Sequence, residues 1–554
     1  MKMYFSGSIY LPESNGLWVM NRLLPIISVI CCLSCSLPQE KEVETPALAY
    51  LKLDDSLLEI SEIVGGLEVP WDIETAEEGK LWFTELSGKI YRLDLQTQEK
   101  VLMLELPDVL SKKSYGLLGM TIDPKSKSAF LHYTFAVPKE GMEEEVNSRL
   151  VKYQISGNSL KNPQILMDSL PGATFHNGSR LLIGPDKKLY FSLGDVGKTD
   201  LTQNKDFLGG KILRLNQDGS IPPENPYPNN PVWAMGLRNS QGLVFGPNQQ
   251  LYGSDHGPLN DDEVNLLIKG GNYGWPDVHG FADSEKEKIF AAKHQTIDPL
   301  FAWTPTIATA GMAYLGENMI PEWENTLLLV SLKGQSLRVL HLSADGKEIK
   351  DEGIFLQKHF GRLRDIALAK NGDIFFGTSN RDWHPRFQPW MYDNLPDGPD
   401  RILRIRKISD PSQIDPSLPV LERETEVIPL KDENWNFEVP DGLENGGILY
   451  TQHCLTCHGP YGKGAAGLIP PLEETEWVIG DKGKLIRVML YGLSEPITVN
   501  GERYHQEMPA YSHLSDEEIA EILTFIRNSF GNKASAVIPG EVYEERKSGL
   551  KSKQ

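Results

Sequence analysis

The sequence predicts an all-β six-bladed β-propeller followed by a small all-α domain. Between residues 58 and 407 a pair of apolar strands recurs six times, as in LWFTEL followed by KIYRLD. The first strands of these pairs begin at residues 81, 130, 189, 251, 327 and 374, and these spacings fit four-stranded propeller blades with loop insertions. Turn signals such as GPD, GPN and KNGD separate the strands. A β-sandwich is the alternative fold, but it would not explain six similar pairs.

The second domain, residues 441–531, is predicted to end in an amphipathic helix. The segment SDEEIAEILTFIRNSFG opens with a capping box formed by Ser515 and Glu518. Its apolar residues recur at helical spacing and form one face: Ile519, Ile522, Leu523, Ile526 and Phe530. Residues 408–440, rich in Pro, Asp and Glu, show no helix or strand period and are predicted to be a linker. Residues 532–554 are predicted to be a polar tail.

The net charge of the chain limits the kinds of partner that it is expected to bind. The 554 residues include 55 basic and 76 acidic side chains, which gives a formal net charge of -21. This excess of negative charge argues against nucleic acid as a partner and against an electrostatic hold on an anionic membrane. We therefore expect a neutral substrate, or one attracted only by local charge.

The first 35 residues read as a secretory signal segment. Residues 20–35 combine a basic start at Arg22, a short apolar run and a small residue before Cys35. The run is too short to span a bilayer. The end of the segment resembles a bacterial lipoprotein cleavage site, with Cys35 as the lipidated first residue, and a plain cleaved signal is the alternative. We expect an exported protein of the bacterial periplasm or cell envelope, anchored at Cys35, with Met20 as an alternative start and residues 36–57 as a spacer.

The cysteines point to a haem. Three of the five lie in the signal segment, and the other two form the motif Cys454-Leu455-Thr456-Cys457-His458. In such a motif two thiols add to the haem vinyl groups and the histidine binds the iron, so His458 is the predicted proximal ligand. Zinc would need two more ligands, and no cysteine is left to supply them. Met508-Pro509-Ala510-Tyr511 resembles the sixth-ligand loop of class I cytochromes c, so Met508 is assigned, with His505 as the rival.

The stretch from Trp233 to Pro276 carries the densest polar chemistry of the propeller. Together with HNGSRLLIGPDKKLYFSLGD, WENTLLLVSLKG and GRLRDI, its motifs GLRNSQGL, SDHGPLNDDEVNLL and GGNYGWP resemble the soluble pyrroloquinoline quinone (PQQ) dehydrogenases of aldoses. The likeness covers roughly residues 60 to 407. Independently of it, Asp195, His256 and Lys333 lie at or just beyond the ends of equivalent inner strands in units three, four and five, which should bring them to one mouth of the central channel.

The resemblance implies roles for named residues. His176 would be the general base, because an imidazole titrates near working pH. The carboxylates and ortho-quinone of PQQ would be held by Arg238, Asn239, Gln241, Lys333, Arg362 and Arg364. Carbonyls of Gly257 and Pro258 would bind the catalytic Ca²⁺, and Glu263 with the Tyr273 carbonyl would bind a second, structural Ca²⁺. Asp195 and the Trp303 region would contact the sugar, with Trp303 as a core residue the alternative, and the role of His256 is open.

These expectations combine into an enzyme that oxidises an aldose to a lactone with PQQ and Ca²⁺ and passes electrons to its own haem c. A downstream redox protein or respiratory acceptor would then take the electrons. Two alternatives come from other classes: a carbohydrate-binding propeller that delivers a cytochrome, and a Ca²⁺-dependent lactone hydrolase. A carbohydrate-binding propeller would not need the Arg and Lys side chains assigned to PQQ. A lactone hydrolase would need the metal ion but not these cationic side chains.

Overall fold

The structure is a computed structural model, and it describes residues 45–112, 114–138, 144–258, 260–317, 320–382, 384–385, 392, 395–409, 414–425, 439–465, 467, 469–493, 495–504, 508, 510–512 and 514–552. The predicted signal segment with Cys35 and the rival haem ligand His505 lie outside the described residues.

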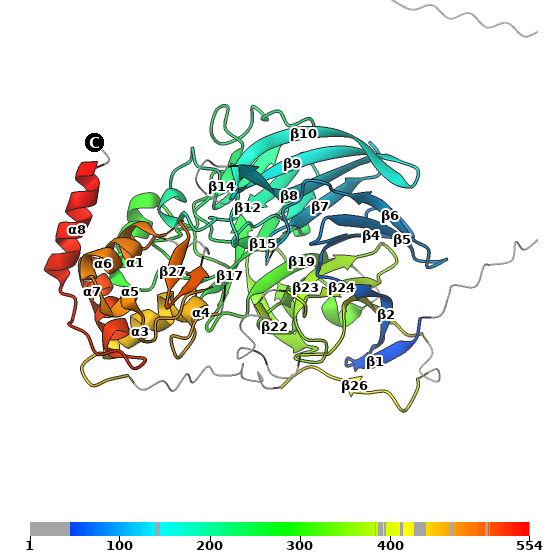
Figure 1. Ribbon diagram of the computed structural model, residues 1–554. Coiled ribbons are helices and arrows are strands. Elements are labelled where there is room, and N and C mark those ends of the chain that lie inside the picture. Colours follow the sequence, from blue (N-terminus) through cyan, green and yellow to red (C-terminus); the bar gives the residue numbers. More distant parts are fainter. Residues whose placement is uncertain are drawn as a thin grey trace, which may run out of the picture. The chain divides into compact units, whose positions relative to one another are not determined.

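The propeller prediction is confirmed, because six antiparallel sheets form six blades (Figure 1). The first three blades are β3 (Pro70–Glu74), β4 (Lys80–Glu85), β5 (Lys89–Asp94) and β6 (Lys100–Glu105); β7 (Leu117–Asp123), β8 (Ser128–Pro138), β9 (Glu144–Ser156) and β10 (Ser159–Pro171); and β11 (Leu181–Ile183), β12 (Leu189–Leu193), β13 (Lys211–Leu215) and β14 (Val232–Met235). The next two are β15 (Ser240–Phe245), β16 (Leu251–Asp255), β17 (Asp262–Leu267) and β18 (Phe301–Trp303); and β19 (Thr309–Leu315), β20 (Thr326–Ser331), β21 (Leu337–Leu342) and β22 (Ile349–Phe355).

The sixth blade closes the ring with strands from both ends of the propeller sequence. Its order is β23 (Leu363–Leu368), β24 (Ile374–Thr378), β25 (Asp400–Lys407), β2 (Leu57–Leu67), β1 (Ala47–Lys52) and β26 (Val420–Leu421). β1 lies in the predicted spacer and β26 in the predicted linker, so the propeller extends beyond residues 58–407 on both sides. β26 pairs in parallel with β1, where Tyr50 is opposite Val420.

The loops that follow the equivalent strands of units three, four and five lie at one mouth of the channel, as expected, but these strands are not the inner ones. The strands that begin near residues 189, 251 and 327 are the second strands of their blades, β12, β16 and β20, and not the innermost ones. In an antiparallel blade the loop after the second strand and the loop that leads into the next blade lie at the same edge. Both kinds of loop therefore reach one mouth of the central channel.

Apolar contacts between neighbouring blades form the core. Phe130, Leu189 and Phe191 are fully buried where the second and third blades meet. Burial of each such side chain stabilises the fold by roughly 1.5–3 kcal/mol. Within the channel, Nη1 of Arg180 lies 2.7 Å from Oδ2 of Asp72 and Nη2 lies 2.8 Å from Oδ1 of Asp365. These buried ion pairs join the third, first and sixth blades.

The C-terminal domain is helical, as predicted. It contains α3 (Glu444–His453), α4 (Leu455–His458), α5 (Glu476–Ile479), α6 (Lys482–Tyr491) and α7 (Asp516–Asn528), with a short hairpin of β27 (Ile497–Val499) and β28 (Glu502–Tyr504). The capping box of α7 is present, since Ser515 accepts a hydrogen bond from the Glu518 N–H and the Glu518 carboxylate accepts one from the Ser515 N–H. Ile519, Ile522, Leu523 and Ile526 of the predicted apolar face are buried, whereas Phe530 lies beyond the end of α7 and is half-buried.

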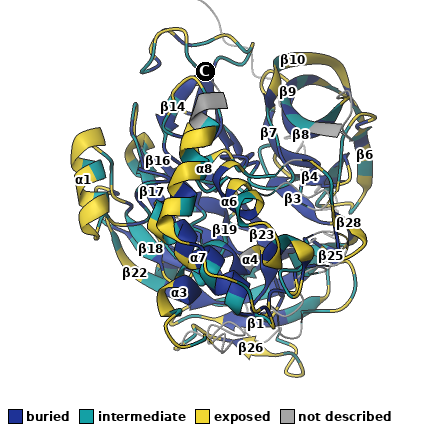
Figure 2. Ribbon diagram, turned by 60° about the vertical axis from the view of Figure 1, so that its left-hand side comes forward, coloured by how far each residue is buried: buried dark blue, intermediate teal, exposed yellow. Residues whose placement is uncertain are grey.

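The region expected to be a polar tail instead contains α8 (Pro539–Ser552). Much of α8 is exposed (Figure 2). It is held by the ion pairs Lys482–Glu541 and Arg487–Glu545 to α6, and by the buried side chain of Val542. None of the helices in the described part of the chain combines the length and apolar character needed to cross a bilayer.

Candidate active site

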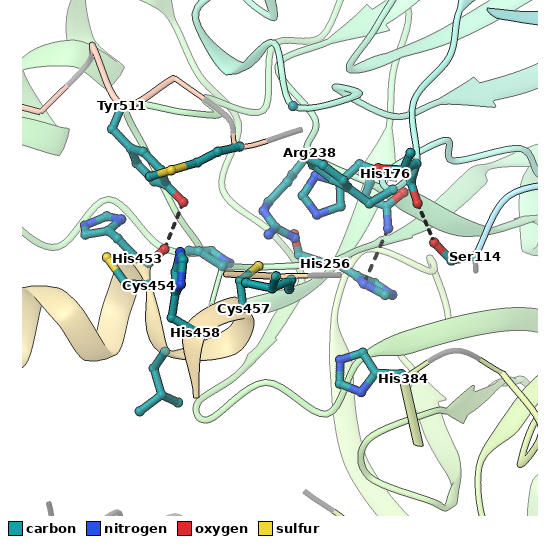
Figure 3. Close-up of a pocket in the computed structure, with 18 of the residues that line it drawn as sticks. Ser114, His176, Arg238, His256, His384, His453, Cys454, Cys457, His458 and Tyr511 are labelled. Atoms are coloured by element: carbon teal, nitrogen blue, oxygen red, sulfur yellow. Dashed lines mark hydrogen bonds between the residues drawn. The ribbon is translucent and has the colours of Figure 1, made fainter. Parts of the chain in front are cut away.

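One cavity of about 570 Å³ reaches from the mouth of the propeller to the helical domain (Figure 3). On the propeller side it is lined by His176 and most of the predicted cofactor-binding residues. On the other side it is lined by Cys454, Cys457, His458 and Met508. The two predicted sites therefore face a common space.

His176 is paired with a buried carboxylate. Its Nδ1 atom lies 2.8 Å from Oδ1 of Asp195, whose side chain is fully buried. Asp195 also accepts hydrogen bonds from Nε1 of Trp275 at 3.0 Å and from the Gly197 N–H at 2.9 Å. Burial and the nearby charge of Arg238 lower the pKa of His176, against the raising effect of Asp195. A neutral imidazole oriented by a carboxylate suits a general base.

The backbone around His176 is tightly constrained. His176 has φ 52°, a left-handed conformation that is costly for a residue with a Cβ atom. Its carbonyl accepts a hydrogen bond from the Val196 N–H at 3.2 Å. A Cβ atom at Gly194 would lie 2.0 Å from that carbonyl, so glycine is required there. The strained turn and this close approach fix the imidazole at the cavity wall.

All six predicted PQQ-binding side chains line the cavity: Arg238, Asn239, Gln241, Lys333, Arg362 and Arg364. They come from the loops that lead into new blades, from the first strands of blades and, for Lys333, from the loop after β20. Among the described lining residues the four cationic side chains outnumber the two carboxylates, Asp262 and Asp382. The cavity therefore favours an anionic ligand.

Asp382 anchors two of the cations. Its Oδ2 atom lies 3.1 Å from Nη2 of Arg362 and 2.5 Å from Nη2 of Arg364. Arg362 also donates a hydrogen bond to the Tyr392 hydroxyl, which contacts Nδ1 of His384 at 2.9 Å. Nη1 of Arg364 donates to Oε1 of Gln241 at 3.3 Å. These bonds hold the guanidinium groups in place before any ligand binds.

Neither of the two predicted sugar contacts is among the residues that line the cavity. Trp303 does not line the cavity, because β18 pairs with β17 and places its ring in an apolar cluster, where its Nε1 donates to Glu352 at 2.8 Å. Asp195 lies behind His176 and does not line the cavity either. Trp275, from the GGNYGWP motif, is the tryptophan at this wall, with Arg238 5.4 Å from the centre of its ring.

His256 lines the cavity but is held within the protein. Its Nε2 atom contacts the Thr309 carbonyl, and burial lowers its pKa to about 3. The next two residues, Gly257 and Pro258, also line the cavity, and Asp262 accepts a hydrogen bond from the Gly257 N–H at 2.8 Å. Burial raises the pKa of Asp262 to about 6. This wall thus combines backbone carbonyls and a carboxylate, which are ligand types suited to Ca²⁺.

Glu263 and Tyr273 line a much smaller cavity of about 10 Å³, together with Asp255 and Asp261. Burial raises the pKa of Glu263 to about 8 and that of Asp255 to about 7. This carboxylate-rich donor set is chemically suited to a hard metal ion. In the described part of the chain, no three His, Cys, Asp or Glu side chains are arranged to hold a metal ion by themselves.

The haem-attachment motif lies at α4, beside α3. Cys454 is buried and Cys457 is exposed, and both thiols are free. Nδ1 of the buried His458 lies 3.1 Å from the Pro470 carbonyl. A histidine that donates from Nδ1 keeps the Nε2 lone pair available for a metal. The motif therefore fits a covalent haem with His458 as its iron ligand.

Met508 lines the same space. Its backbone forms hydrogen bonds of 2.8 and 2.9 Å with the backbone of Leu493, which lies two residues after the end of α6. Its side chain packs against the apolar core of the helical domain. Met508 as the sixth ligand stays a prediction.

Several lining residues had no sequence signal. Asp382, His384 and Tyr392 line the cavity but lie outside the motifs used for prediction. They follow β24 in a segment without a repeating apolar pattern, whereas Trp71 lies in GLEVPWDI, a further motif of the resemblance. Their positions depend on the closure of the ring, which brings the first and sixth blades together.

Comparisons with known proteins find relatives of both the propeller and the helical domain. The family model described as Glucose / Sorbosone dehydrogenase matches residues 67–384, and that described as Cytochrome C oxidase, cbb3-type, subunit III matches residues 441–526. Quinoprotein glucose dehydrogenase B of Acinetobacter calcoaceticus is 30% identical over 400 residues, which cover 57% of this chain and 84% of that protein. Cytochrome c-552 of Thermus thermophilus is 34% identical over 130 residues, 19% of this chain and 98% of that protein.

Among solved structures, the PQQ-bound form of aldose sugar dehydrogenase from Streptomyces coelicolor has a TM-score of 0.53 and 29% identity, and the match covers 66% of this chain and all of that one. The propeller is therefore homologous to quinoprotein glucose and aldose sugar dehydrogenases. The chain belongs to the glucose/sorbosone dehydrogenase family and carries a fused cytochrome c domain.

Proposed function

We propose that this protein oxidises an aldose at the anomeric carbon to the lactone and passes the electrons to its own haem c. The single observation that carries the proposal is the common cavity, which joins the His176 side of the propeller to the Cys457 side of the cytochrome domain. The family and the fused cytochrome domain support both halves of the reaction.

The residues at the propeller mouth fit PQQ. Arg238, Lys333, Arg362 and Arg364 offer positive charge for its carboxylates, and two of these guanidinium groups are already fixed by Asp382. Asn239 and Gln241 add amide groups. PQQ, when bound, supplies an ortho-quinone that can accept a hydride.

His176 would remove the proton of the anomeric hydroxyl while the hydrogen on carbon 1 leaves as hydride. The lowered pKa keeps the imidazole neutral and ready to accept that proton. Asp195 would then stabilise the imidazolium that forms, across the 2.8 Å contact. The carbonyls of Gly257 and Pro258 would hold Ca²⁺ at the same mouth, and the metal would act as a Lewis acid.

The cytochrome domain supplies the acceptor. Cys457, whose thiol would become a haem thioether, lines the same cavity as Arg238. Figure 3 shows both residues at the centre of the cavity. Arg238 would hold the cofactor and Cys457 would hold the haem at this common cavity, an arrangement that would favour electron transfer between the two groups.

An anaerobic stopped-flow experiment tests the proposal. Haem-loaded protein, reconstituted with PQQ and Ca²⁺, is mixed with glucose and other aldoses while the haem absorption is followed. We expect sugar-dependent haem reduction whose rate constant does not depend on protein concentration. The His176→Ala variant is the control, because it retains the haem and should lose the reaction. Absence of haem reduction and of dye reduction with every aldose would overturn the proposal.

Export is a separate proposal. We propose that the signal segment directs the chain to the periplasm or cell envelope and that Cys35 carries a lipid. Mass spectrometry of the protein purified from a bacterial membrane fraction tests this, with Cys35→Ala as the control that should release the protein from that fraction. A parent protein found only in the soluble fraction, without lipid, would contradict lipid anchoring.

A further inference from the structure

Lys211 is a buried cation that the proposed reaction does not use. It is the first residue of β13, where it pairs with Leu193 of β12 and Met235 of β14, and its side chain is fully buried. Lysine is almost never fully buried unless other groups compensate its charge. The partners of its ammonium group therefore indicate what it contributes to the site.

The ammonium group of Lys211 holds the loop that follows Asp195. Its Nζ atom donates a hydrogen bond to the Thr202 carbonyl at 2.6 Å and another to the Gly209 carbonyl at 2.8 Å. Thr202 ends the 3-10 turn η1 (Thr199–Leu201), which begins four residues after Asp195. Two hydrogen bonds from one buried donor therefore fix this turn against the start of β13.

The same loop holds Trp275. The Trp275 carbonyl accepts a hydrogen bond from Nε2 of Gln203 at 2.8 Å, and the Thr202 hydroxyl lies 2.8 Å from the same oxygen. Nε1 of Trp275 donates to Oδ2 of Asp195 at 3.0 Å, while Oδ1 of that carboxylate contacts Nδ1 of His176 at 2.8 Å. A continuous chain of contacts therefore leads from the buried lysine through the loop and Trp275 to the proposed base.

The charges of these groups agree with that route. Burial lowers the pKa of Lys211 to about 7, and the negative charge of Asp195 opposes this change. Burial and the charge of Arg238 lower the pKa of His176, whereas Asp195 raises it. Asp195 is thus the group through which a change at Lys211 would reach the imidazole.

We propose that Lys211 is a positioning residue, which fixes the loop and Trp275 so that Asp195 stays against the proposed base, an inference that rests on the proposed function. Loss of the ammonium group would loosen the carboxylate. The imidazole of His176 would then be less well oriented, and it would lose part of the negative charge that favours its protonated form. The rate and the pH profile should therefore change together.

The test is Lys211→Met in the full-length protein loaded with haem, PQQ and Ca²⁺, assayed with an aldose and a small artificial dye. We expect kcat to fall by about 10²-fold, which a misplacement of about 1 Å can cause. The acid limb of kcat/KM should move to lower pH, because Asp195 would raise the pKa of the base less. Lys152→Met is the matched control, since Lys152 is a half-buried lysine that donates to the Gln217 carbonyl at 3.3 Å and lies over the Phe130 ring. It should leave both quantities unchanged.

A second measurement follows the imidazole without turnover. The rate at which diethylpyrocarbonate modifies His176, located by mass spectrometry, depends on the neutral fraction of the ring and so gives its pKa. We expect this pKa to be lower in Lys211→Met than in the parent protein. In the Asp195→Asn background, Lys211→Met should give no further shift, since the two changes act on one contact. If Lys211→Met does not fold, Lys211→Gln, whose amide can still donate a hydrogen bond, replaces it.

An acid limb and a His176 pKa that both stay in place would overturn the inference. A shift to higher pH would overturn it too, because it would show a direct effect of the lysine charge on the imidazole. A full shift in the Asp195→Asn background would exclude the route through Asp195. A parent protein that oxidises no aldose would instead overturn the proposed function, and the pKa of His176 would still show whether Lys211 acts through Asp195.

Discussion

Nδ1 of His176 and Oδ1 of Asp195 lie 2.8 Å apart, with the imidazole at the cavity and the carboxylate fully buried behind it. The carboxylate fixes the orientation of the ring and opposes the lowering of its pKa by burial. This pair gives the first two predictions.

His176→Ala should lower kcat with dye acceptors by about 10²- to 10⁴-fold, because loss of a general base removes about 3 to 5 kcal/mol of transition-state stabilisation. PQQ binding, measured by calorimetry, should survive, since His176 is not one of the cationic anchors. Turnover within a few-fold of the parent protein would show that another group is the base.

Asp195→Asn should shift the pH profile as well as slow the reaction. The base acts when neutral, so activity rises with pH through the pKa of His176. Because Asp195 raises that pKa, its loss should lower it and move the acid limb of kcat/KM to lower pH. The measurement is the pH dependence of kcat/KM, with the exposed Asp206→Asn as control. An acid limb that stays in place would contradict the pairing.

Asp382→Ala should destabilise the propeller, because it leaves the buried guanidinium groups of Arg362 and Arg364 without their shared carboxylate. Loss of one partner of a buried ion pair typically costs about 3–5 kcal/mol. Chemical denaturation should show this decrease in the free energy of unfolding, and added PQQ should recover part of it. Asp168→Ala, which breaks the exposed contact with Arg149, is the control and should cost no more than about 1 kcal/mol. Equal effects of the two changes would be the contrary result.

Calcium-free protein should become less stable as pH rises from about 5 to 8. Burial raises the pKa of Glu263 to about 8 and that of Asp255 to about 7, so the folded state keeps protons that the unfolded state has lost. Stability therefore falls with pH in this range. Added Ca²⁺ should raise the melting temperature more at pH 8 than at pH 5, as measured by differential scanning fluorimetry. In Glu263→Gln this pH-dependent response should shrink, and a response that is equal in both proteins would place the ion elsewhere.

Met508→Ala should lower the haem potential while Cys454 and Cys457 keep the haem attached, because a thioether ligand raises the potential of haem iron. Sugar oxidation with an artificial dye should continue, and sugar-dependent haem reduction in anaerobic stopped flow should fail. His505→Ala is the comparison. If only His505→Ala changes the spectrum and the reduction rate, the histidine holds the sixth position.

The sequence was sufficient for those features that depend on local pattern. Strand pairs repeat along the chain, so six blades could be counted without knowledge of their contacts. The spacing of Cys454, Cys457 and His458 is itself the haem signal. His176 and the cationic residues were assigned by resemblance, and all of them line the cavity.

What the sequence could not show depends on contacts between distant segments. β26 has only two residues and forms by pairing with the edge strand β1. A segment this short has no apolar periodicity from which a strand could be predicted. Trp275 ends the polar central stretch and Trp303 follows it, and only the pairing of β17 with β18 decides that Trp303 enters the core. α8 is a polar helix that ion pairs connect to α6. Because the composition of this segment does not reveal these contacts, the sequence alone predicts a polar tail.

β26 also bears on how the enzyme behaves when it is diluted. By pairing with β1 at Val420 and Leu421, it ties the first part of the linker to the propeller and shortens the stretch of chain that joins the cytochrome domain to it. A shorter tether raises the effective concentration of one domain at the other. Under the proposed function, the electron acceptor would therefore stay beside the propeller however few molecules are present, as a separately diffusing cytochrome would not.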